Sequence, residues 1–347
     1  MLYVTTRDKV DAFTPHRALT EERGKCGGCY LPYRLPVLMK DQLHDLVKQS
    51  FSERIATVLR LFFPAKISGW EVEVAVGRYP VRIAAMNHKI AVVETWHNHD
   101  GSFDCLVEKL YHSMTREEVN TGDPGAWFRI VARIAVLAAA LGELMKTGIA
   151  DTAKPADISL PVNDFEGVMA AWYARKMGLP LGVIMFVCND NSSLWDFFHN
   201  GELQTNSKIR ATVTPDSDHT VPQCLEMLIY ETLGFQEVQR FVNACQYCQR
   251  YDIREDQLAM LKDGLFCGVV RQHRLETVIS NIYCTNSYLM DPYTALAFGG
   301  LQDYRASAGE TGIALILSDQ SPICALSAME RILGIPAADI QKIVDHR

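Results

Sequence analysis

A short polar segment near residue 100 combines the side-chain types used in acid/base catalysis and in metal binding. It reads His97-Asn98-His99-Asp100, with Asp104 four residues further on. Imidazole nitrogens and carboxylate oxygens bind divalent transition metals, and the same groups donate and accept protons in catalysis. The sequence therefore predicts either a site built from His97, His99, Asp100 and Asp104, or a polar exposed loop without chemistry.

Two pairs of cysteines have the spacing that lets two thiolates bind one zinc ion from a tight turn. They are Cys26-Gly-Gly-Cys29 and Cys245-Gln-Tyr-Cys248. If the fold brings the pairs together, the four side chains form a structural zinc site. The alternative is that they are ordinary reduced cysteines, since the second pair lies in a helical pattern and most other cysteines lie in apolar stretches, where cysteine packs as a small hydrophobe.

Length and composition restrict the protein class. The chain has 347 residues, 48% of them hydrophobic, which is enough for one large core or two ordinary ones. Its net charge of −7 arises from mixed signs without a basic block, so we do not expect nucleic acid as a partner. Arg133 interrupts the apolar stretch Val131 to Leu141, and the N-terminus lacks the layout of a signal peptide. We expect a cytoplasmic protein without a membrane span.

Hydrophobic periodicity predicts an α/β protein whose strands and helices alternate after residue 150. We divide the chain into an N-terminal α/β module, residues 1–90, and a main α/β domain, residues 91–347. Strands are expected over 70–78, 89–95, 158–162, 183–188 and 313–317. Helices are expected over 41–63, 126–146, 166–177, 192–198, 225–248, 256–261, 294–304, 324–333 and 337–344.

Several segments, in the same order along the chain, resemble motifs of the threonine synthase family. The family's phosphate-loop strand, turn and helix are similar to residues 160–180, and the likeness continues through residues 189–201. The other matching segments are Tyr3-Val4-Thr5-Thr6-Arg7, Gly27-Gly28-Cys29-Tyr30-Leu31-Pro32 and Asp291-Pro292-Tyr293-Thr294-Ala295. The resemblance implies the α/β scaffold of fold-type II pyridoxal phosphate (PLP) enzymes, which is like tryptophan synthase β: a parallel sheet with helices on both faces.

The resemblance also locates the lysine that forms the imine with PLP in the family. The matching segment here is residues 97–105, and Asp104 occupies the lysine position. A carboxylate cannot form an imine, so we expect no PLP chemistry at this position. Lys89 is the nearest lysine that could replace it.

The family's phosphate-binding turn, glycine-asparagine-phenylalanine-glycine, corresponds to Asn163-Asp164-Phe165-Glu166. Without the glycines the backbone cannot approach a phosphate as closely, and two added carboxylates repel a dianion. We expect this degenerate turn not to bind phosphate. Asp164 and Glu166 are expected instead to complete a carboxylate-rich cleft opposite residues 97–104, suited to a cation or an amine.

Two further differences concern the surroundings of the cofactor. The family places a small mobile domain between the lysine motif and the phosphate turn, but only residues 105–159 separate those motifs here, so we expect that domain to be largely deleted. Ser318 or Asp319 is expected where the family has a threonine near the pyridine nitrogen.

These observations predict a threonine-synthase-like protein without PLP, which binds a small amino-acid-like ligand or a protein partner in amino-acid or specialised metabolism. A homodimer that covers the apolar surface left by the missing domain is also expected. Two alternatives stay open: an enzyme with PLP-independent, metal-assisted chemistry in the old cleft, and a PLP-dependent threonine-synthase-type lyase that uses a displaced lysine.

Overall fold

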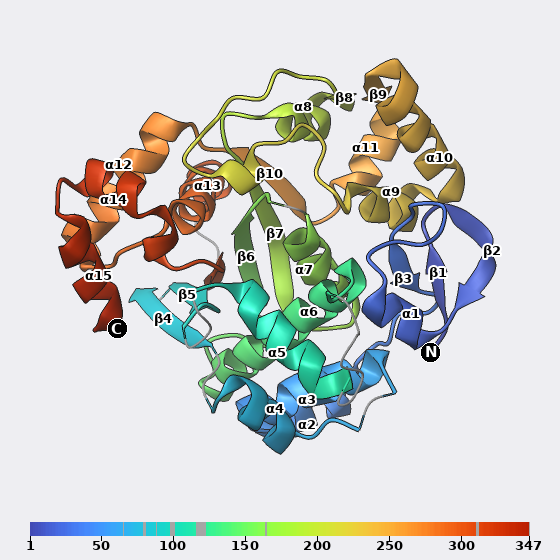
Figure 1. Cartoon of the computed structure of the whole chain (residues 1–347), viewed down its shortest axis with the longest axis horizontal. Helices are drawn as coiled ribbons and strands as arrows, with labels where there is room; N and C mark the ends of the chain where they lie inside the picture. The colour runs from blue at the N-terminus through green and yellow to red at the C-terminus, as the bar shows by residue number, and fades with distance from the viewer. Residues whose placement is uncertain are drawn as a thin grey trace.

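The computed structural model describes residues 1–64, 66–78, 81–87, 89–97, 101–115, 123–163, 165–309 and 312–346. A six-stranded sheet lies at its centre, with strand order β10-β7-β6-β11-β5-β4 (Figure 1). All neighbouring strands run parallel except the edge strand β4, which is antiparallel to β5. The strands are β4 (Arg82–Asn87), β5 (Ile90–Glu94), β6 (Ala156–Pro161), β7 (Leu181–Cys188), β10 (Leu265–Val269) and β11 (Ala314–Ser318).

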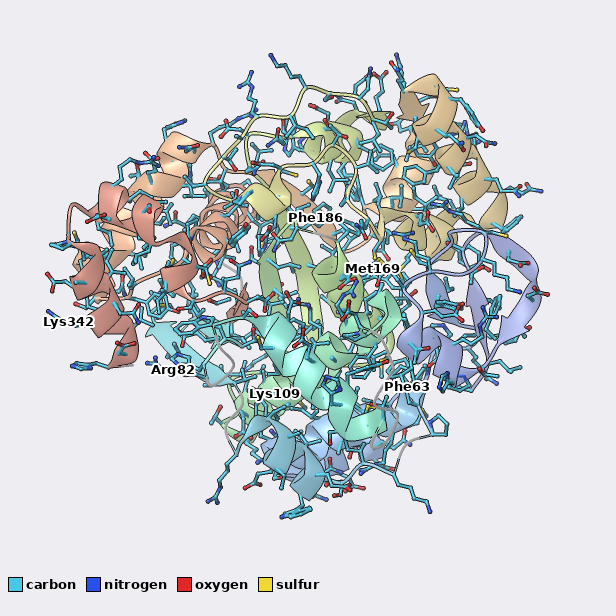
Figure 2. All side chains as sticks on the ribbon, viewed as in Figure 1. Phe63, Arg82, Lys109, Met169, Phe186 and Lys342 are labelled. Atoms are coloured by element: carbon cyan, nitrogen blue, oxygen red, sulfur yellow. The ribbon has the colours of Figure 1, made fainter. Side chains whose placement is uncertain are left out.

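Helices cover both faces of this sheet, so the central strands are apolar on both sides. Along β7, Ile184 and Phe186 pack with α6 (Ala126–Lys146) and α7 (Glu166–Lys176). Met185 and Val187 point the other way and pack with α12 (Gln272–Asn286) and α13 (Pro292–Ala308). Figure 2 shows Phe186 in the interior, whereas Lys342 lies at the periphery near the C-terminus.

Smaller units surround the central layers. A three-stranded antiparallel sheet near the N-terminus has the order β2-β1-β3, and a two-stranded ribbon joins β8 and β9. These strands are β1 (Tyr3–Thr5), β2 (Asp8–Phe13), β3 (Tyr30–Pro32), β8 (Glu202–Gln204) and β9 (Arg250–Asp252). The remaining helices are α1 (Pro15–Thr20), α2 (Lys40–Lys48), α3 (Phe51–Phe62), α4 (Gly69–Val76), α5 (Phe103–Thr115), α8 (Ser193–Asn200), α9 (Leu225–Leu233), α10 (Phe235–Asn243), α11 (Glu255–Leu261), α14 (Leu326–Leu333) and α15 (Ala337–Asp345), with the short helices η1 (Pro215–Ser217), η2 (Ala244–Cys248) and η3 (Pro322–Ala325).

Most of the predicted helices and strands are confirmed, with two helices each divided by a cap. The range 41–63 is divided because α2 ends at Lys48 and Ser50 caps the start of α3, where its hydroxyl accepts from Glu53 N at 3.2 Å. Gly234, at φ +89°, separates α9 from α10 within 225–248. The sequence prediction lacked β4, β10, α5 and α12, and also the peripheral elements α1, β2, β3, β8 and β9. The division at residue 90 stays a prediction, although β4 joins the central sheet from the N-terminal side of it.

The strand expected over 70–78 is wrong, because this segment forms helix α4. A capping box begins the helix: Ser68 Oγ accepts from Glu71 N at 3.3 Å, and Glu71 Oε2 accepts from Ser68 N at 2.8 Å. Val72 and Val76 are buried one helical turn apart, while Val74 is exposed. Valines at every second position are therefore compatible with both a strand and a helix here. The capping box favours the helix.

Within the part of the chain that the structure describes, no helix has both the length and the apolar character needed to cross a bilayer. The long helix α6 is buried in the core instead, in agreement with the prediction from Arg133.

Arg54 of α3 is fully buried and ties together three helices. Its Nε donates to Leu46 O at 3.0 Å and its Nη2 to Val47 O at 2.8 Å, which satisfies carbonyls at the end of α2. Its Nη1 donates to Ala139 O at 3.0 Å and to Glu143 Oε1 at 2.5 Å, both on α6. The guanidinium therefore replaces water for the carbonyls of two neighbouring helices.

The change Arg54→Met should lower the free energy of unfolding by about 3 kcal/mol, because it leaves buried carbonyls without a donor. Arg60→Met, on the same helix but at a partly exposed position, should change it by less than about 1 kcal/mol. Urea denaturation of both variants measures the difference, and equal effects would show that Arg54 has no special role.

Asp291 caps α13 from a fully buried position below the carboxyl end of β11. Its Oδ1 accepts from Tyr293 N at 2.8 Å and from Thr294 N at 3.0 Å. Its Oδ2 accepts from Thr294 Oγ1 and, at 3.2 Å, from Ser318 Oγ. Ser318 Oγ in turn accepts from Trp96 Nε1 at 3.1 Å. Burial raises the pKa of Asp291 to about 6, although the hydrogen bonds from Thr294, Tyr293 and Ser318 oppose the rise.

Because the folded-state pKa of Asp291 lies above its unfolded value, this group stabilises the fold below about pH 4 and loses that contribution as the pH rises through about 6. Relative to Asp291→Asn, the free energy of unfolding of the natural chain should fall by up to about 3 kcal/mol between about pH 4 and pH 7. Denaturation at a series of pH values tests this, with the exposed Asp339→Asn as control; a difference that does not vary with pH would contradict it.

Candidate functional site

A cavity of about 420 Å³ lies at the carboxyl ends of the central strands. Open α/β sheets bind ligands at this edge. Its walls come from the start of α5, from α6 and α7, from the residues after β6 and β11, and from the segment between β8 and α9. The lining residues are Ser102, Phe103, Asp104, Arg133, Leu160, Pro161, Asn163, Gly167, Asp216, His219, Val221, Gln223, Asp319 and Gln320.

An ion pair joins Arg133 of α6, which is buried, to Asp319, which is partly exposed directly after β11. The Arg133 guanidinium donates to Asp319 Oδ2, and its carbon lies 3.9 Å from the centre of the Phe103 ring. Thr95 Oγ1 donates to Asp319 Oδ1 at 2.9 Å, and Phe103 N donates to the carbonyl oxygen of Asp319 at 2.8 Å. The pair thus connects the ends of β5 and β11 with the beginnings of α5 and the wall formed by α6.

A second carboxylate, Asp216, is held by neutral donors. Tyr293 Oη donates to Asp216 Oδ2 at 2.8 Å, and Gln320 Nε2 donates to the same oxygen at 3.1 Å. Burial and the nearby carboxylate raise the pKa of Tyr293, so that its phenol stays a donor. These two neutral partners therefore orient the Asp216 carboxylate without neutralising its charge.

Asp104, at the position that the family resemblance assigns to lysine, is exposed in the first turn of α5 and lines the cavity. Among the described residues that line the cavity there is no lysine. Lys89 directly precedes β5, so it lies at the amino edge of the sheet, opposite the cavity.

His97 does not join Asp104, which corrects the predicted grouping of the two residues in one site. It stacks on Trp96, with ring centres 4.0 Å apart, and its Nε2 contacts the buried carboxylate of Glu94. Burial raises the pKa of Glu94, but the hydrogen bonds from His97 and Tyr288 outweigh that effect and hold it below its usual value. His97 is not among the residues that line the cavity. His99 and Asp100 lie outside the described residues.

The degenerate phosphate turn is held by the segment between β8 and α9. Ser217 Oγ donates to Asn163 Oδ1 at 2.9 Å, and His219 Nε2 contacts the Asn163 carbonyl. Phe165 is buried in the left-handed conformation at φ 70°, which is strained by roughly 1 kcal/mol for a residue other than glycine. Asp164 lies outside the described residues.

Glu166 is buried in an ion pair with Arg129 and is not among the residues that line the cavity. Arg129 Nη2 donates to Glu166 Oε1 at 2.6 Å, and Arg129 Nε donates to Oε2 at 3.0 Å. Our expectation that Glu166 completes the carboxylate-rich cleft is therefore wrong. Asp216 and Asp319 supply the carboxylates opposite Asp104.

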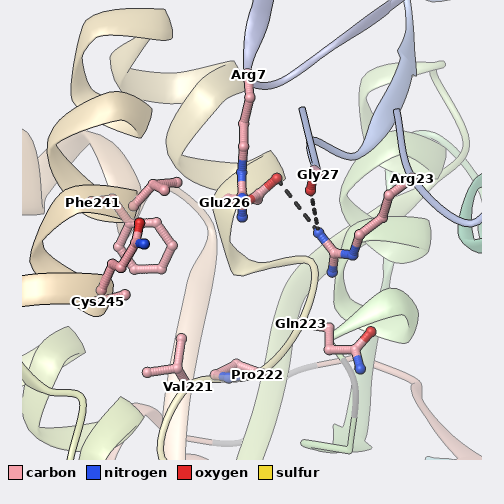
Figure 3. Close-up of a pocket in the computed structure, with 11 residues that line it drawn as sticks. Arg7, Arg23, Gly27, Val221, Pro222, Gln223, Glu226, Phe241 and Cys245 are labelled. Carbon is pink, nitrogen blue, oxygen red and sulfur yellow. Dashed lines mark hydrogen bonds and ion pairs between the residues drawn. The ribbon is translucent and has the colours of Figure 1, made fainter. Parts of the chain in front are cut away.

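The four cysteines are not grouped as the zinc alternative requires. No group of three or more His, Cys, Asp or Glu side chains within the described ranges is placed to hold a metal ion. Cys29 is buried, and Arg23 Nη1 lies 3.4 Å from its sulfur, whereas Cys26 and Cys248 are exposed. Cys245 lines a second cavity, about 470 Å³ in volume (Figure 3).

Of the two residues expected near the old pyridine site, Asp319 lines the cavity and Ser318 does not. Sequence reasoning did not identify Arg133, Asp216 or His219 as site residues. Arg133 could have been identified from the sequence, because it interrupts an apolar helix and a buried guanidinium requires a carboxylate partner. Asp216 and His219 lie in an irregular segment with no local pattern to single them out.

Comparisons with known proteins concern the sequence and the fold of the chain. The family model described as the threonine synthase N terminus matches residues 2–78. The human protein "Threonine synthase-like 1" is 24% identical over 174 residues, and the match covers 49% of this chain. Threonine synthase from Pseudomonas aeruginosa is 22% identical over 151 residues, 43% of this chain. The matches span only 23% and 32% of the length of these two relatives.

The fold is similar to solved threonine synthases over nearly the whole chain. The yeast enzyme has a TM-score of 0.85 at 15% identity, covering 99% of this chain and 93% of that one. PLP-bound threonine synthase from Brucella melitensis has a TM-score of 0.83 at 16% identity, covering 96% and 92%. At such identities the likeness concerns the fold. The chain is therefore threonine-synthase-like, in the sequence of its N-terminal segment and in the α/β fold of its whole length.

Proposed function

We propose that this threonine-synthase-like protein does not bind PLP and instead binds a small amino-acid-like ligand in the central cavity. The observation that supports the proposal is Asp104, which lines the cavity and which the sequence resemblance assigns to the position of the family's lysine. An amine must attack the PLP aldehyde to form the imine, and a carboxylate cannot do so.

A displaced lysine does not fit the cavity either. Lys89 stands at the amino edge of the central sheet, and β5 separates that edge from the cavity by roughly 16 Å. Its carbonyl also accepts from Ala314 N at 2.9 Å, which fixes the backbone at this edge.

The turn that cradles phosphate in the family is also unsuited to a dianion here. The carbonyl and the side chain of Asn163 are engaged by His219 and Ser217, and Phe165 occupies a conformation that favours glycine. The carboxylates in the cavity wall would repel a phosphate. We propose further that the domain covering the cofactor in the family is reduced, since α5 and α6 are the elements described between Asp104 and β6.

The charge of the cavity supports a ligand that carries an ammonium group. Its lining contains three carboxylates, Asp104, Asp216 and Asp319, and one guanidinium, Arg133, which is paired with Asp319. The formal excess is negative, and amide and hydroxyl groups around it offer further hydrogen bonds. An ammonium group bound to Asp216 would form a charge-assisted hydrogen bond to a carboxylate that is already oriented.

The first test concerns the cofactor. Purified protein incubated with PLP, reduced with borohydride and analysed by mass spectrometry should carry no stoichiometric adduct, because none of the described residues that line the cavity is a lysine. A threonine synthase that contains the active-site lysine is the positive control. One equivalent of adduct on a single lysine of this chain would disprove the proposal.

The second test concerns the ligand. Binding of n-butylammonium and of the common L-amino acids, measured by calorimetry, should include at least one amine whose affinity falls about tenfold in Asp216→Asn, because the variant loses the charge of one hydrogen bond. Asp45→Asn, at an exposed position, is the matched control. If no amine binds, or if binding is the same in Asp216→Asn, the ligand class is wrong even where PLP is absent.

A further inference from the structure

The second cavity lies between the N-terminal sheet and helices α9 and α10, and charged side chains form one of its walls (Figure 3). It is lined by Arg7, Arg23, Gly27, Val221, Pro222, Gln223, Glu226, Phe241, Val242, Cys245 and Gln246. Val221 and Gln223 also line the central cavity, so the two cavities share one thin wall.

Glu226 is buried at the base of this wall and its carboxylate is fully engaged. Its Oε1 accepts from Thr6 Oγ1 at 2.6 Å and from Cys29 N at 3.2 Å. Its Oε2 accepts from Arg7 Nε at 3.0 Å and from Arg7 Nη2 at 2.5 Å. One arginine therefore neutralises this carboxylate in a two-pronged ion pair.

Arg23 brings a second guanidinium to the same place. Its Nη1 donates to Gly27 O at 3.1 Å and lies 3.7 Å from Glu226 Oε1, as the dashed lines in Figure 3 show. Its Nε and Nη2 form no hydrogen bond with the described part of the chain. Arg7 and Arg23 against Glu226 leave one positive charge in excess, in a chain whose net charge is −7.

The turn between Cys26 and Cys29 permits this arrangement. Gly27 has φ +77°, and a Cβ there would lie 3.1 Å from Arg7 Nη1. The glycine thus lets its carbonyl approach Arg23 while the backbone passes close to Arg7.

The opposite wall is apolar and carries no competing anion. Val221, Pro222, Phe241 and Val242 form it, next to Cys245. Burial raises the pKa of the Cys245 thiol to about 11, so that this side chain stays neutral.

We propose that this cavity is a second binding site, which takes an organic monocarboxylate with an apolar body. Its carboxylate binds Arg23, and its hydrocarbon or aromatic part packs on Val221, Phe241 and Val242. The single excess charge matches a monoanion better than a phosphate dianion, and the apolar wall gains from a hydrophobic body. This site goes beyond the proposed function, because it shares no charged residue with the central cavity.

Calorimetry with 3-phenylpropanoate as probe tests the site. The natural chain should bind it, and Arg23→Gln should weaken binding at least tenfold, while Arg23→Lys retains part of the affinity. Arg34→Gln removes an exposed arginine at another position and should bind as the natural chain does. Asp216→Asn should not weaken binding of this anion, whereas it weakens binding of an amine in the central cavity, which separates the two tests.

A second variant guards against a merely structural effect of Arg23. Val242→Asp places a negative charge in the apolar wall and should abolish binding while the thermal unfolding midpoint is monitored as a check of folding. The proposal is overturned if 3-phenylpropanoate does not bind, if Arg23→Gln binds it equally well, or if inorganic phosphate binds more tightly and displaces it.

Discussion

The ion pair between Arg133 and Asp319 is the constraint on which the centre of this molecule depends. A guanidinium buried in the apolar helix α6 needs a carboxylate partner, because leaving a buried charge unpaired is strongly destabilising. Asp319 directly follows β11, so the pair determines how α6 lies against the carboxyl edge of the sheet. Through Thr95 and Phe103 it also positions the end of β5 and the start of α5. The central cavity lies between these elements, where they meet at the carboxyl edge of the sheet.

Much of the sheet could be predicted because its strands are buried on both faces. Continuous apolar runs such as Val183 to Cys188 have few alternatives when turn residues bound them, and the sequence places β6, β7 and β11 within two residues of their ends. The segment after residue 70 fails for a physical reason. Val72, Val74 and Val76 alternate like a strand, but a capping box formed by Ser68 and Glu71 makes the helix. Strand β10 and helix α12 have mixed patterns, and their contacts with neighbours such as β7 and α13 stabilise them.

The candidate site was less accessible from the sequence than the fold. Family resemblance located Asp104, because a motif carries its position along the chain. It could not tell that His97 turns toward Glu94, since that contact depends on where β5 ends and where Tyr288 approaches. It also missed Asp216, whose side chain Tyr293 of α13 and Gln320 hold in the cavity wall. Contacts between residues far apart in sequence decide these side-chain directions, and no local period encodes them.

The two cavities have opposite charge, and this difference follows from their positions in the fold. The central cavity gathers carboxylates from α5, from the segment after β8 and from the end of β11, with one arginine already paired. The second gathers two arginines from the N-terminal segment around one carboxylate of α9. In a medium of low dielectric constant, charges interact over several ångströms. The charges of one cavity therefore act on those of the other across the wall that Val221 and Gln223 form. If both proposed ligands bind, the cation in one cavity and the anion in the other attract across that wall, and each should then favour binding of the other.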